Sequence, residues 1–373
     1  MAASPDLNDS DLIQLTDRGL YCPAGDFYVD PWRPVERAVV THAHADHARR
    51  GMGAYLAAEA SREILERRLG EEAVVEGVEW GKTHRFAGRD GDVQVSFHPA
   101  GHVRGSAQVR VEGSVGGRRR VWVISGDYKR AADPTCRGFE PVPCDVFVTE
   151  ATFALPVYRW PPASQVAEEI LAWWDGNRAA GRASLLLTYS LGKAQRALAE
   201  LARLTDRGAW LHGAAQGLTE IYRRQGVEMI PTQPVAGTPK DKDWAGELIV
   251  APPSAYASPW SRRFGELSTG FASGWMRVRG GRRRRGYDRG FVLSDHADWP
   301  NLVRTVEETG AERVLVTHGS SATLARYLRE ERGIDASPLE TAFRGEEGDD
   351  EAGDDAGETA EGTGEETAGE PSA

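Results

Sequence analysis

The chain has 373 residues, of which 40% are hydrophobic, and its formal net charge is −11. This length exceeds one average domain and suggests about two. No apolar run approaches the roughly 18 residues that cross a bilayer, and the first residues lack a signal-peptide pattern. The three scattered cysteines argue against a disulfide framework. We therefore expect a soluble, cytoplasmic protein with no membrane partner.

The first predicted buried strand, at residues 35–40, runs directly into a dense group of metal-binding side chains. His42 and His44 lie two positions apart, so on an extended segment they point the same way and can bind one ion. Asp46 and His47 follow where we expect the chain to turn into a helix, and they can face a second ion. A solvated, histidine-rich loop is the alternative, but four such ligands within six positions behind a strand rarely occur by chance. The pattern predicts a metal site.

Up to about residue 155 the predicted elements are mostly strands. Residues 19–32 read as a strand and a turn, and residues 59–69 have helical spacing. Compact apolar or alternating runs predict further strands at 55–58, 92–97, 107–111, 121–124 and 146–148. This pattern is typical of two packed sheets flanked by helices.

Two more ligand candidates follow predicted strands. His102 lies in a glycine-containing turn between two strands, and Asp127 follows the strand at 121–124. A lone His or Asp in a loop is usually structural, but each adds a ligand type that two coordination spheres would need. A carboxylate that bridges two ions about 3.5–4 Å apart recurs in two-metal hydrolases.

Between residues 156 and 291 helices alternate with strands, which indicates an α/β insert with a parallel sheet. Within it, Ser190 and Lys193 flank a glycine turn that opens a helix, a suitable place for a phosphate, although a plain strand-to-helix turn is an equal alternative. Arg277 and Arg279 begin an arginine-rich run that either attracts polyanions or is a solvated loop tip. After Asp298 we expect helix, strand and helix.

The last segment has a different composition. Residues 345–373 hold twelve acidic side chains and no Lys or Arg, so the rest of the chain carries 45 basic against 44 acidic side chains. We expect residues 344–373 to form a disordered acidic tail, with a solubilising role favoured over a docking arm.

Taken together, these residues resemble a known family. The series His42, His44, Asp46, His47, His102 and Asp127 is similar in order and spacing to the metallo-β-lactamase fold. Glu150, His296 and His318 resemble the three motifs of the β-CASP nucleases. The resemblance runs from about residue 11 to 343. It implies an α/β (α+β) architecture in which a metallo-β-lactamase αββα sandwich (residues 1–155 and 292–343) carries an inserted β-CASP domain (residues 156–291).

The resemblance also implies roles for single residues. His42, His44 and His102 would hold the first ion; Asp46, His47 and His318 the second; and Asp127 would bridge them. Asp46, Glu150 and His296 are the expected catalytic side chains, with Glu150 fixing a ligand imidazole and His296 facing the scissile phosphate. Two zinc ions suit this set, and manganese or iron would also be accepted.

The segments at 251–254, 273–276 and 294–299 are similar to one β-CASP subgroup, the bacterial exonucleases associated with an ATP-dependent DNA ligase and a helicase. This implies a DNA exonuclease acting in repair. RNA processing is the alternative, because family members that act on RNA tend to carry histidine at the position of His318. A small-molecule metallo-hydrolase is a more distant alternative, since such an enzyme needs no insert of roughly 130 residues.

Overall fold

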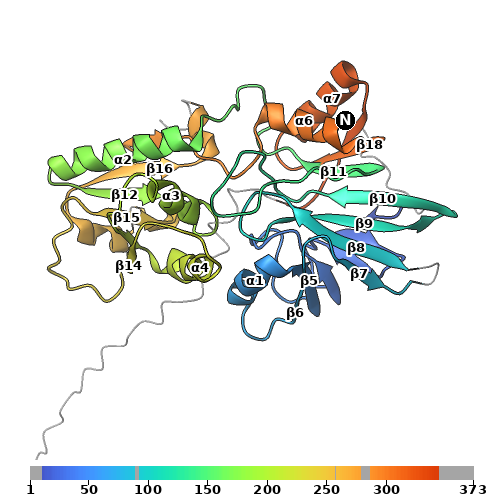
Figure 1. Cartoon of the computed structure of the whole chain (residues 1–373), viewed down its shortest axis with the longest axis horizontal. Coiled ribbons are helices and arrows are strands. Elements are labelled where there is room, and N and C mark those ends of the chain that lie inside the picture. The colour runs from blue at the N-terminus through green and yellow to red at the C-terminus, as the bar shows by residue number, and fades with distance from the viewer. Residues whose placement is uncertain (1–10, 89–91, 257, 279–285, 344–373) are drawn as a thin grey trace, which may run out of the picture.

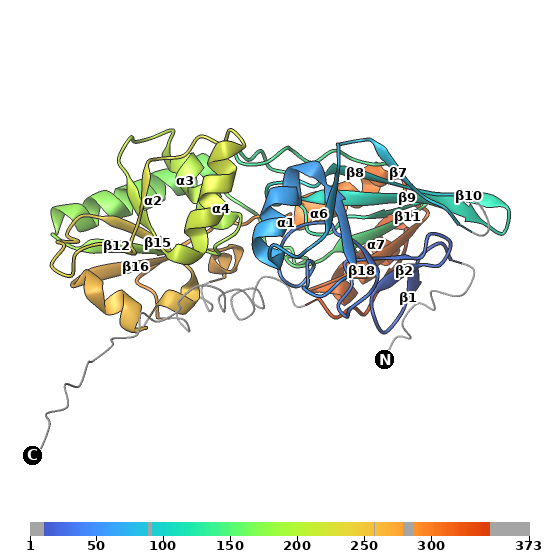
Figure 2. The ribbon, with the colours of Figure 1, turned by 90° about the horizontal axis from the view of Figure 1, so that it is seen from below.

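The computed structural model describes residues 11–88, 92–256, 258–278 and 286–343. Arg279, the rest of the arginine-rich run to residue 285, and the predicted acidic tail therefore lie outside the described residues. The molecule is elongated, with one group of strands and helices at each end of its long axis (Figures 1 and 2). None of the described helices is long and apolar enough to cross a membrane.

Two sheets are built from the first and last parts of the chain. The first has the order β1 (Gln14–Leu15), β2 (Leu20–Cys22), β3 (Phe27–Val29), β4 (Arg37–Val39), β5 (Ala54–Ala58) and β6 (Val75–Val78). The second has the order β19 (Asp335–Pro338), β18 (Arg313–Thr317), β11 (Val146–Glu150), β10 (Arg118–Ile124), β9 (Ala107–Val115), β8 (Val93–Pro99) and β7 (Thr83–Phe86). Both sheets are mixed. Strands β3 to β6 run parallel to one another, as do β10, β11, β18 and β19. The pairs β1–β2, β2–β3, β7–β8, β8–β9 and β9–β10 are antiparallel.

These two sheets pack face to face and are covered by helices. Their inner faces share one buried apolar cluster that includes Phe27, Val39 and Leu56 of the first sheet and Val95, Val109 and Trp122 of the second. Helices α6 (Trp299–Thr309) and α7 (Ser321–Arg332) cover the outer face of the second sheet, and α1 (Arg62–Leu69), preceded by η1 (Glu59–Ser61), covers the first. The layers are therefore helix, sheet, sheet and helix, as the strand pattern predicted.

The third sheet comes wholly from residues 183–291, and all its strands are parallel to their neighbours. Its order is β14 (Thr232–Pro234), β13 (Ala209–Leu211), β15 (Leu248–Ala251), β12 (Ala183–Leu187), β16 (Leu267–Ala272) and β17 (Arg289–Phe291). Along β12, Leu186 packs on one side, whereas Leu185 and Leu187 pack on the other, so the strand is apolar on both faces. The expected parallel sheet is thus present; the boundaries at 155/156 and 291/292 stay a prediction.

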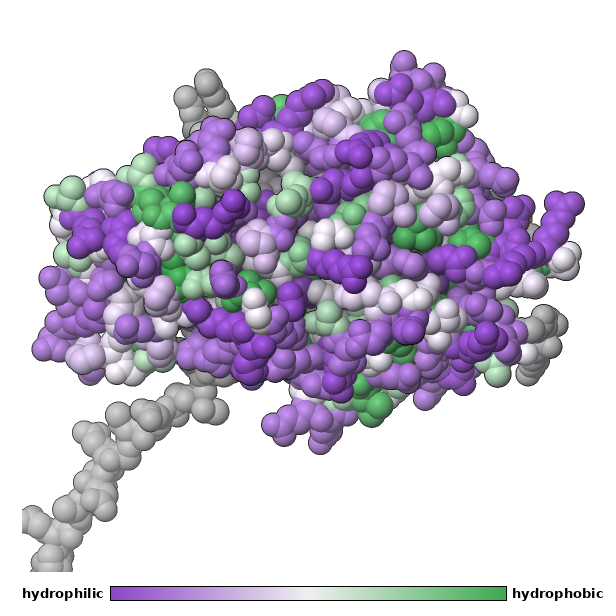
Figure 3. Space-filling model, in the orientation of Figure 1, coloured by the Kyte–Doolittle hydropathy of each residue, from purple (hydrophilic) through white to green (hydrophobic). Residues whose placement is uncertain are grey.

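Helices lie on both faces of this third sheet. One face carries α2 (Ala163–Ala179), α3 (Lys193–Leu201) and α4 (Gly213–Arg224). The short helices η2 (Pro253–Ala255), η3 (Pro259–Phe264) and η4 (Gly274–Arg277) contribute to the cluster on the other. The surface in Figure 3 is mostly hydrophilic, with hydrophobic residues scattered over it, which fits a chain whose apolar side chains are used in these cores.

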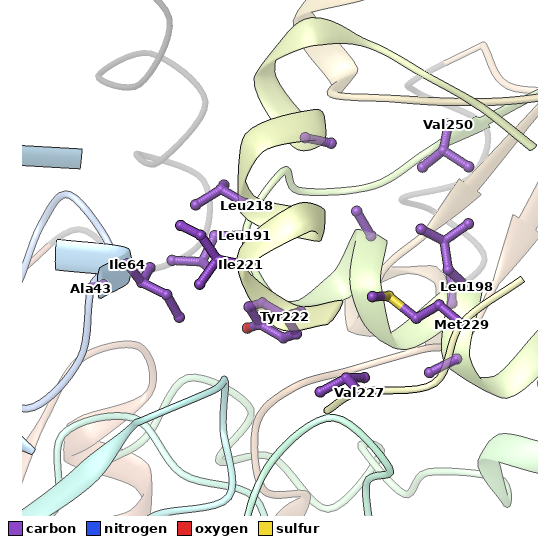
Figure 4. Packing of buried hydrophobic residues seen from close by; sticks show 14 of the residues in the cluster. Ala43, Ile64, Leu191, Leu198, Leu218, Ile221, Tyr222, Val227, Met229 and Val250 are labelled. Carbon is purple, nitrogen blue, oxygen red and sulfur yellow. The ribbon is translucent and has the colours of Figure 1, made fainter. Parts of the chain in front are cut away.

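One apolar cluster joins the third sheet to the first. Ala43 and Ile64 lie opposite Leu191, Leu218 and Ile221 (Figure 4). Polar contacts reinforce the junction, because Arg104 donates from Nε to the side chain of Gln225 at 2.7 Å and from Nη2 to its carbonyl at 2.7 Å. Since Ala43 lies between two of the predicted ligands, this junction fixes the third sheet close to the predicted metal site.

Candidate metal centre

Three predicted site residues gather at one edge of the second sheet. Because β10, β11 and β18 run parallel, their carboxyl ends meet at the same edge. Asp127 follows β10, Glu150 ends β11, and His318 follows β18. His318 has a φ of 62°, a left-handed conformation that is rare for residues other than glycine, and Gly319 after it packs so closely that a Cβ would lie 2.4 Å from the carbonyl oxygen of Ala151. The tight turn begins directly after Thr317, which pairs with Glu150 across β18 and β11.

The segment after β4 differs from its prediction. It forms a turn, in which the N–H groups of His47 and Ala48 donate to the carbonyl of His44 at 3.1 and 2.8 Å, and no helix begins until η1 and α1. The predicted helix directly after His47 is therefore wrong. The bonds to the carbonyl of His44 close a single turn, and the chain then continues to the extended strand β5, so no further helical turn is added.

The first ligand group contains His42, His44, His102 and Asp127, all buried, with one ligand atom from each lying within 4.8 Å of the others. His44 Nδ1 lies 3.1 Å from His42 Nε2 and 3.0 Å from His102 Nε2. In a tetrahedral site with metal–nitrogen distances of about 2.0–2.1 Å, ligand nitrogens lie roughly 3.3 Å apart. The three imidazoles thus have the spacing of ligands around a common ion.

The other nitrogen of each of these rings faces an oxygen. His44 Nε2 lies 3.3 Å from the carbonyl oxygen of Leu191, His102 Nδ1 lies 2.9 Å from that of Asp295, and His42 Nδ1 lies 3.1 Å from Thr41 Oγ1. A carbonyl can only accept, so His44 and His102 donate outward and keep their inner nitrogens as lone pairs. These contacts orient the rings for metal binding.

The second ligand group contains Asp46, His47 and His318, again buried. His47 Nε2 lies 3.7 Å from Asp46 Oδ2. The carboxylate of Asp127 lies between the two groups: its Oδ2 is 3.6 Å from His42 Nε2 and 3.8 Å from His47 Nε2, while its Oδ1 is 4.0 Å from His318 Nε2. Asp127 is placed to touch ions in both groups.

Several polar atoms at the centre are buried and have no hydrogen-bond partner among the described residues: His47 Nε2, Asp127 Oδ1, and both ring nitrogens of His318. A buried polar atom left unsatisfied costs about 1–3 kcal/mol. Cations held between the two groups would satisfy the first two atoms and one nitrogen of His318. The donor set, imidazole with carboxylate, suits zinc and related divalent metals, so the residues fit the predicted ions.

The pKa values of the ligand histidines also favour a metal site. Burial lowers the pKa of His42 and His102 well below the usual value and that of His318 to about 3, so these rings are neutral and able to bind metal. Burial also lowers the pKa of His47, but Asp46, Asp30 and Asp127 outweigh it and raise this pKa to about 10. The carboxylates around His47 favour positive charge there, which either a proton or a metal ion can supply.

Glu150 and His296 form a buried pair beside the ligands. The Glu150 carboxylate lies 2.9 Å from His296 Nδ1 and accepts the N–H of Tyr128 at 2.9 Å. Its imidazole partner is thus His296 and not one of the predicted ligand imidazoles, which corrects the expected role of Glu150. Glu150 and His296 also lie with Asp127 in a third group whose ligand atoms are within 4.8 Å. Trp160 Nε1 donates to the carbonyl of His296 at 2.8 Å and holds the backbone in place.

The predicted substrate-binding residues are placed differently from one another. Lys193 is fully buried, 3.6 Å from the carboxylate of Asp295 and 4.4 Å from the ring centre of Tyr189, so a phosphate there would compete with Asp295. Ser190 is half-buried, and its carbonyl accepts from Gln195. Arg277 is exposed and donates to the carbonyl of Val157 at 3.3 Å. Arg279 lies outside the described residues.

Two contributors were missed from the sequence. Asp30 is buried directly after β3. Its carboxylate accepts a hydrogen bond from His47 Nδ1 at 2.7 Å and another from the N–H of Thr41 at 2.8 Å. Asp295 holds His102 through its carbonyl and is itself fixed by Arg196 of α3 at 3.2 Å. The sequence could have indicated Asp30, because this carboxylate directly follows β3, which is parallel to β4 and ends at the same edge of the sheet. No sequence pattern indicates the role of the Asp295 carbonyl.

Comparisons with known proteins place the chain more broadly. It matches no protein-family model. It is 31% identical over 326 residues to a curated protein of Opitutus terrae (strain DSM 11246 / JCM 15787 / PB90-1) named probable DNA ligase, and the match covers 85% of this chain and 30% of that protein. The chain therefore spans less than a third of the relative's length. A crystal structure of a protein of unknown function from Enterococcus faecalis V583 is similar with a TM-score of 0.51 at 10% identity, over 83% of this chain and 80% of that one, which shows a shared fold alone.

Proposed function

We propose that this chain is a two-metal phosphodiesterase that degrades DNA from an end, in a metallo-β-lactamase domain (residues 1–155 and 292–343) with a β-CASP insert (residues 156–291). The observation that carries the proposal is the pair of buried ligand groups that meet at Asp127 beside the Glu150–His296 pair. The preference for DNA is supported by the name of the relative, probable DNA ligase, and by the subgroup resemblance. A functional association with a DNA ligase and a helicase belongs to the same proposal.

The chemistry divides between the ions and the side chains. When bound, two divalent ions supply a water activated at neutral pH and neutralise charge on the scissile phosphate. Glu150 accepts a hydrogen bond from Nδ1–H of His296 and so orients the ring. In the doubly protonated ring, which the Glu150 charge would stabilise, Nε2–H would donate to the leaving oxygen or protonate it. Asp30 and the carbonyls of Leu191 and Asp295 keep the ligand imidazoles in the tautomer that binds metal. His296 is therefore expected to affect turnover without holding either ion.

The test uses one nucleotide sequence made as DNA and as RNA, single- and double-stranded, labelled at either end, with zinc or manganese supplied. We expect mononucleotide release from DNA well above that from RNA. His296→Ala should lower kcat by about 10²–10⁴-fold and retain both ions. A matched control is His84→Ala, because His84 is paired with Glu76 at 3.2 Å on an edge strand of the second sheet and belongs to none of the ligand groups. Internal cuts in RNA with DNA intact would overturn the DNA assignment, and metal-independent activity would overturn the mechanism.

A further inference from the structure

The ring of Phe343, in the segment after β19, lies against two predicted ligands of the second ion. Its centroid is 4.6 Å from that of His47 and 4.7 Å from that of His318, with interplanar angles of 5° in both cases. The two imidazoles are themselves 5.3 Å apart and inclined by 10°. These are offset-stacking distances, so one phenyl ring contacts the faces of both imidazoles.

This stacking matters because hydrogen bonds orient these imidazoles less completely than those of the first group. His42, His44 and His102 each have an oxygen near the nitrogen that faces away from the ligand cluster. In the second group only His47 has one, the carboxylate of Asp30, whereas both nitrogens of His318 are buried without a hydrogen-bond partner among the described residues. The stacked ring of Phe343 can fix the rotation of His318 about its χ2 angle in place of a hydrogen bond.

Phe343 is held in place by its own neighbours. Trp32 meets it edge-on, with centroids 5.6 Å apart and planes at 87°, and Trp32 Nε1 is anchored on the carbonyl of Asp17 at 2.8 Å. The segment before Phe343 is tied to β18, since Thr341 and Thr317 share a hydrogen bond of 2.6 Å between their hydroxyl groups. Trp32 follows Asp30 by two residues, so one loop supports both the carboxylate and the ring that hold His47.

We propose that Phe343 is a positioning residue for the second ion: it stacks on His47 and His318 and keeps their Nε2 atoms directed at the metal. The inference rests on the proposed two-metal function. Phe343 takes part in no chemical step, since a phenyl ring neither binds the ion nor moves a proton. Its contribution is geometric and should appear as metal affinity.

The test compares wild type with Phe343→Ala, Phe343→Leu and Phe343→Tyr. Each protein is loaded with zinc and dialysed against graded chelator, and bound metal per chain is measured. We expect wild type and Phe343→Tyr to retain two ions over the same range. Phe343→Ala should release one ion at about 10- to 100-fold lower chelator strength and keep the other as wild type does, the range seen when a supporting partner of a metal ligand is lost. Tyr327→Ala is the matched control, because Tyr327 is a half-buried aromatic whose ring meets that of Trp299 edge-on and belongs to none of the ligand groups.

The outcomes separate the inference from the proposed function. If wild type binds fewer than two ions, the proposed function fails and the inference fails with it. If wild type binds two ions and Phe343→Ala retains both with unchanged affinity, the inference alone is overturned. If Phe343→Leu holds the second ion as tightly as wild type, filling of space and not stacking is the role, which also overturns it. Melting temperatures of the metal-free variants, expected to lie close together, show that lost metal is not lost fold.

Discussion

The two ligand groups share Asp127 but are supported in different ways. The first is neutral apart from Asp127 and is oriented by contacts that come partly from outside the first two sheets, since Leu191 belongs to the segment between β12 and α3. The second adds the charge of Asp46, is oriented through Asp30, and has aromatic stacking where the first has hydrogen bonds. The second group carries more negative charge, whereas in the first group every imidazole has an oxygen partner. Because His318 has no such partner among the described residues, we expect the second of the two proposed ions to leave first when metal is withdrawn.

The largest effect should come from Asp127, which serves both groups. Asp127→Asn removes the only negative charge of the first group and weakens contacts to both. Loss of the ions forfeits several kcal/mol of stabilisation of the transition state, so cleavage should fall by roughly a thousandfold or more. Metal analysis and cleavage assays on the same preparation check this. Two ions retained at full activity would show that the groups do not depend on a shared carboxylate.

A smaller and more selective effect is expected from Asp30. Asp30→Asn keeps the size of the side chain and tolerates the positive φ of 44° at this position, but it removes the charge that supports His47. Affinity for the second ion should fall by about 10- to 100-fold, with the first unchanged. Isothermal titration with zinc measures both affinities. An equal loss at both sites would contradict the separation between the two groups.

The smallest effect is expected from removal of the acidic tail. A chain ending after Arg344 retains Phe343 and loses the twelve acidic side chains of residues 345–373. Melting temperature, metal content and cleavage of a labelled strand should remain close to those of the full chain, because a segment of this composition has little to bury. Loss of the second ion on truncation would show that residues beyond Phe343 take part in holding it.

Much of the architecture was predictable from the sequence because strand patterns are local. The strands β5, β8, β10 and β11 were expected from short runs of apolar side chains, and the helix α6 was expected after Asp298. Ligand types at strand ends predicted that His102 and Asp127 would meet the histidines of the first motif. The turn at His47 was predicted as the start of a helix. The local sequence does not show that the chain stops after one turn and continues to β5.

The supporting contacts of the centre were less accessible. A carbonyl oxygen such as that of Leu191 is present at every residue, so no sequence pattern distinguishes the one that will face His44. The partner of Glu150 depended on how the segment before α6 packs against β11, which is set by tertiary contacts such as the Trp160 bond to the carbonyl of His296. In the sequence, Phe343 is a single aromatic residue after the last strand, and no pattern around it indicates a role. Its position depends on contact with Trp32, more than three hundred residues earlier.

The spread of the ligands along the chain has a consequence for biosynthesis. His42 follows β4, and His318 follows β18, 276 residues further along the chain. At roughly 5–20 residues per second, about 15–55 seconds separate the synthesis of these two residues. During that interval the early histidines exist without the residues that complete their coordination. The candidate metal centre is therefore completed only after β18 has been added to the sheet, so that formation of the site is coupled to completion of the fold.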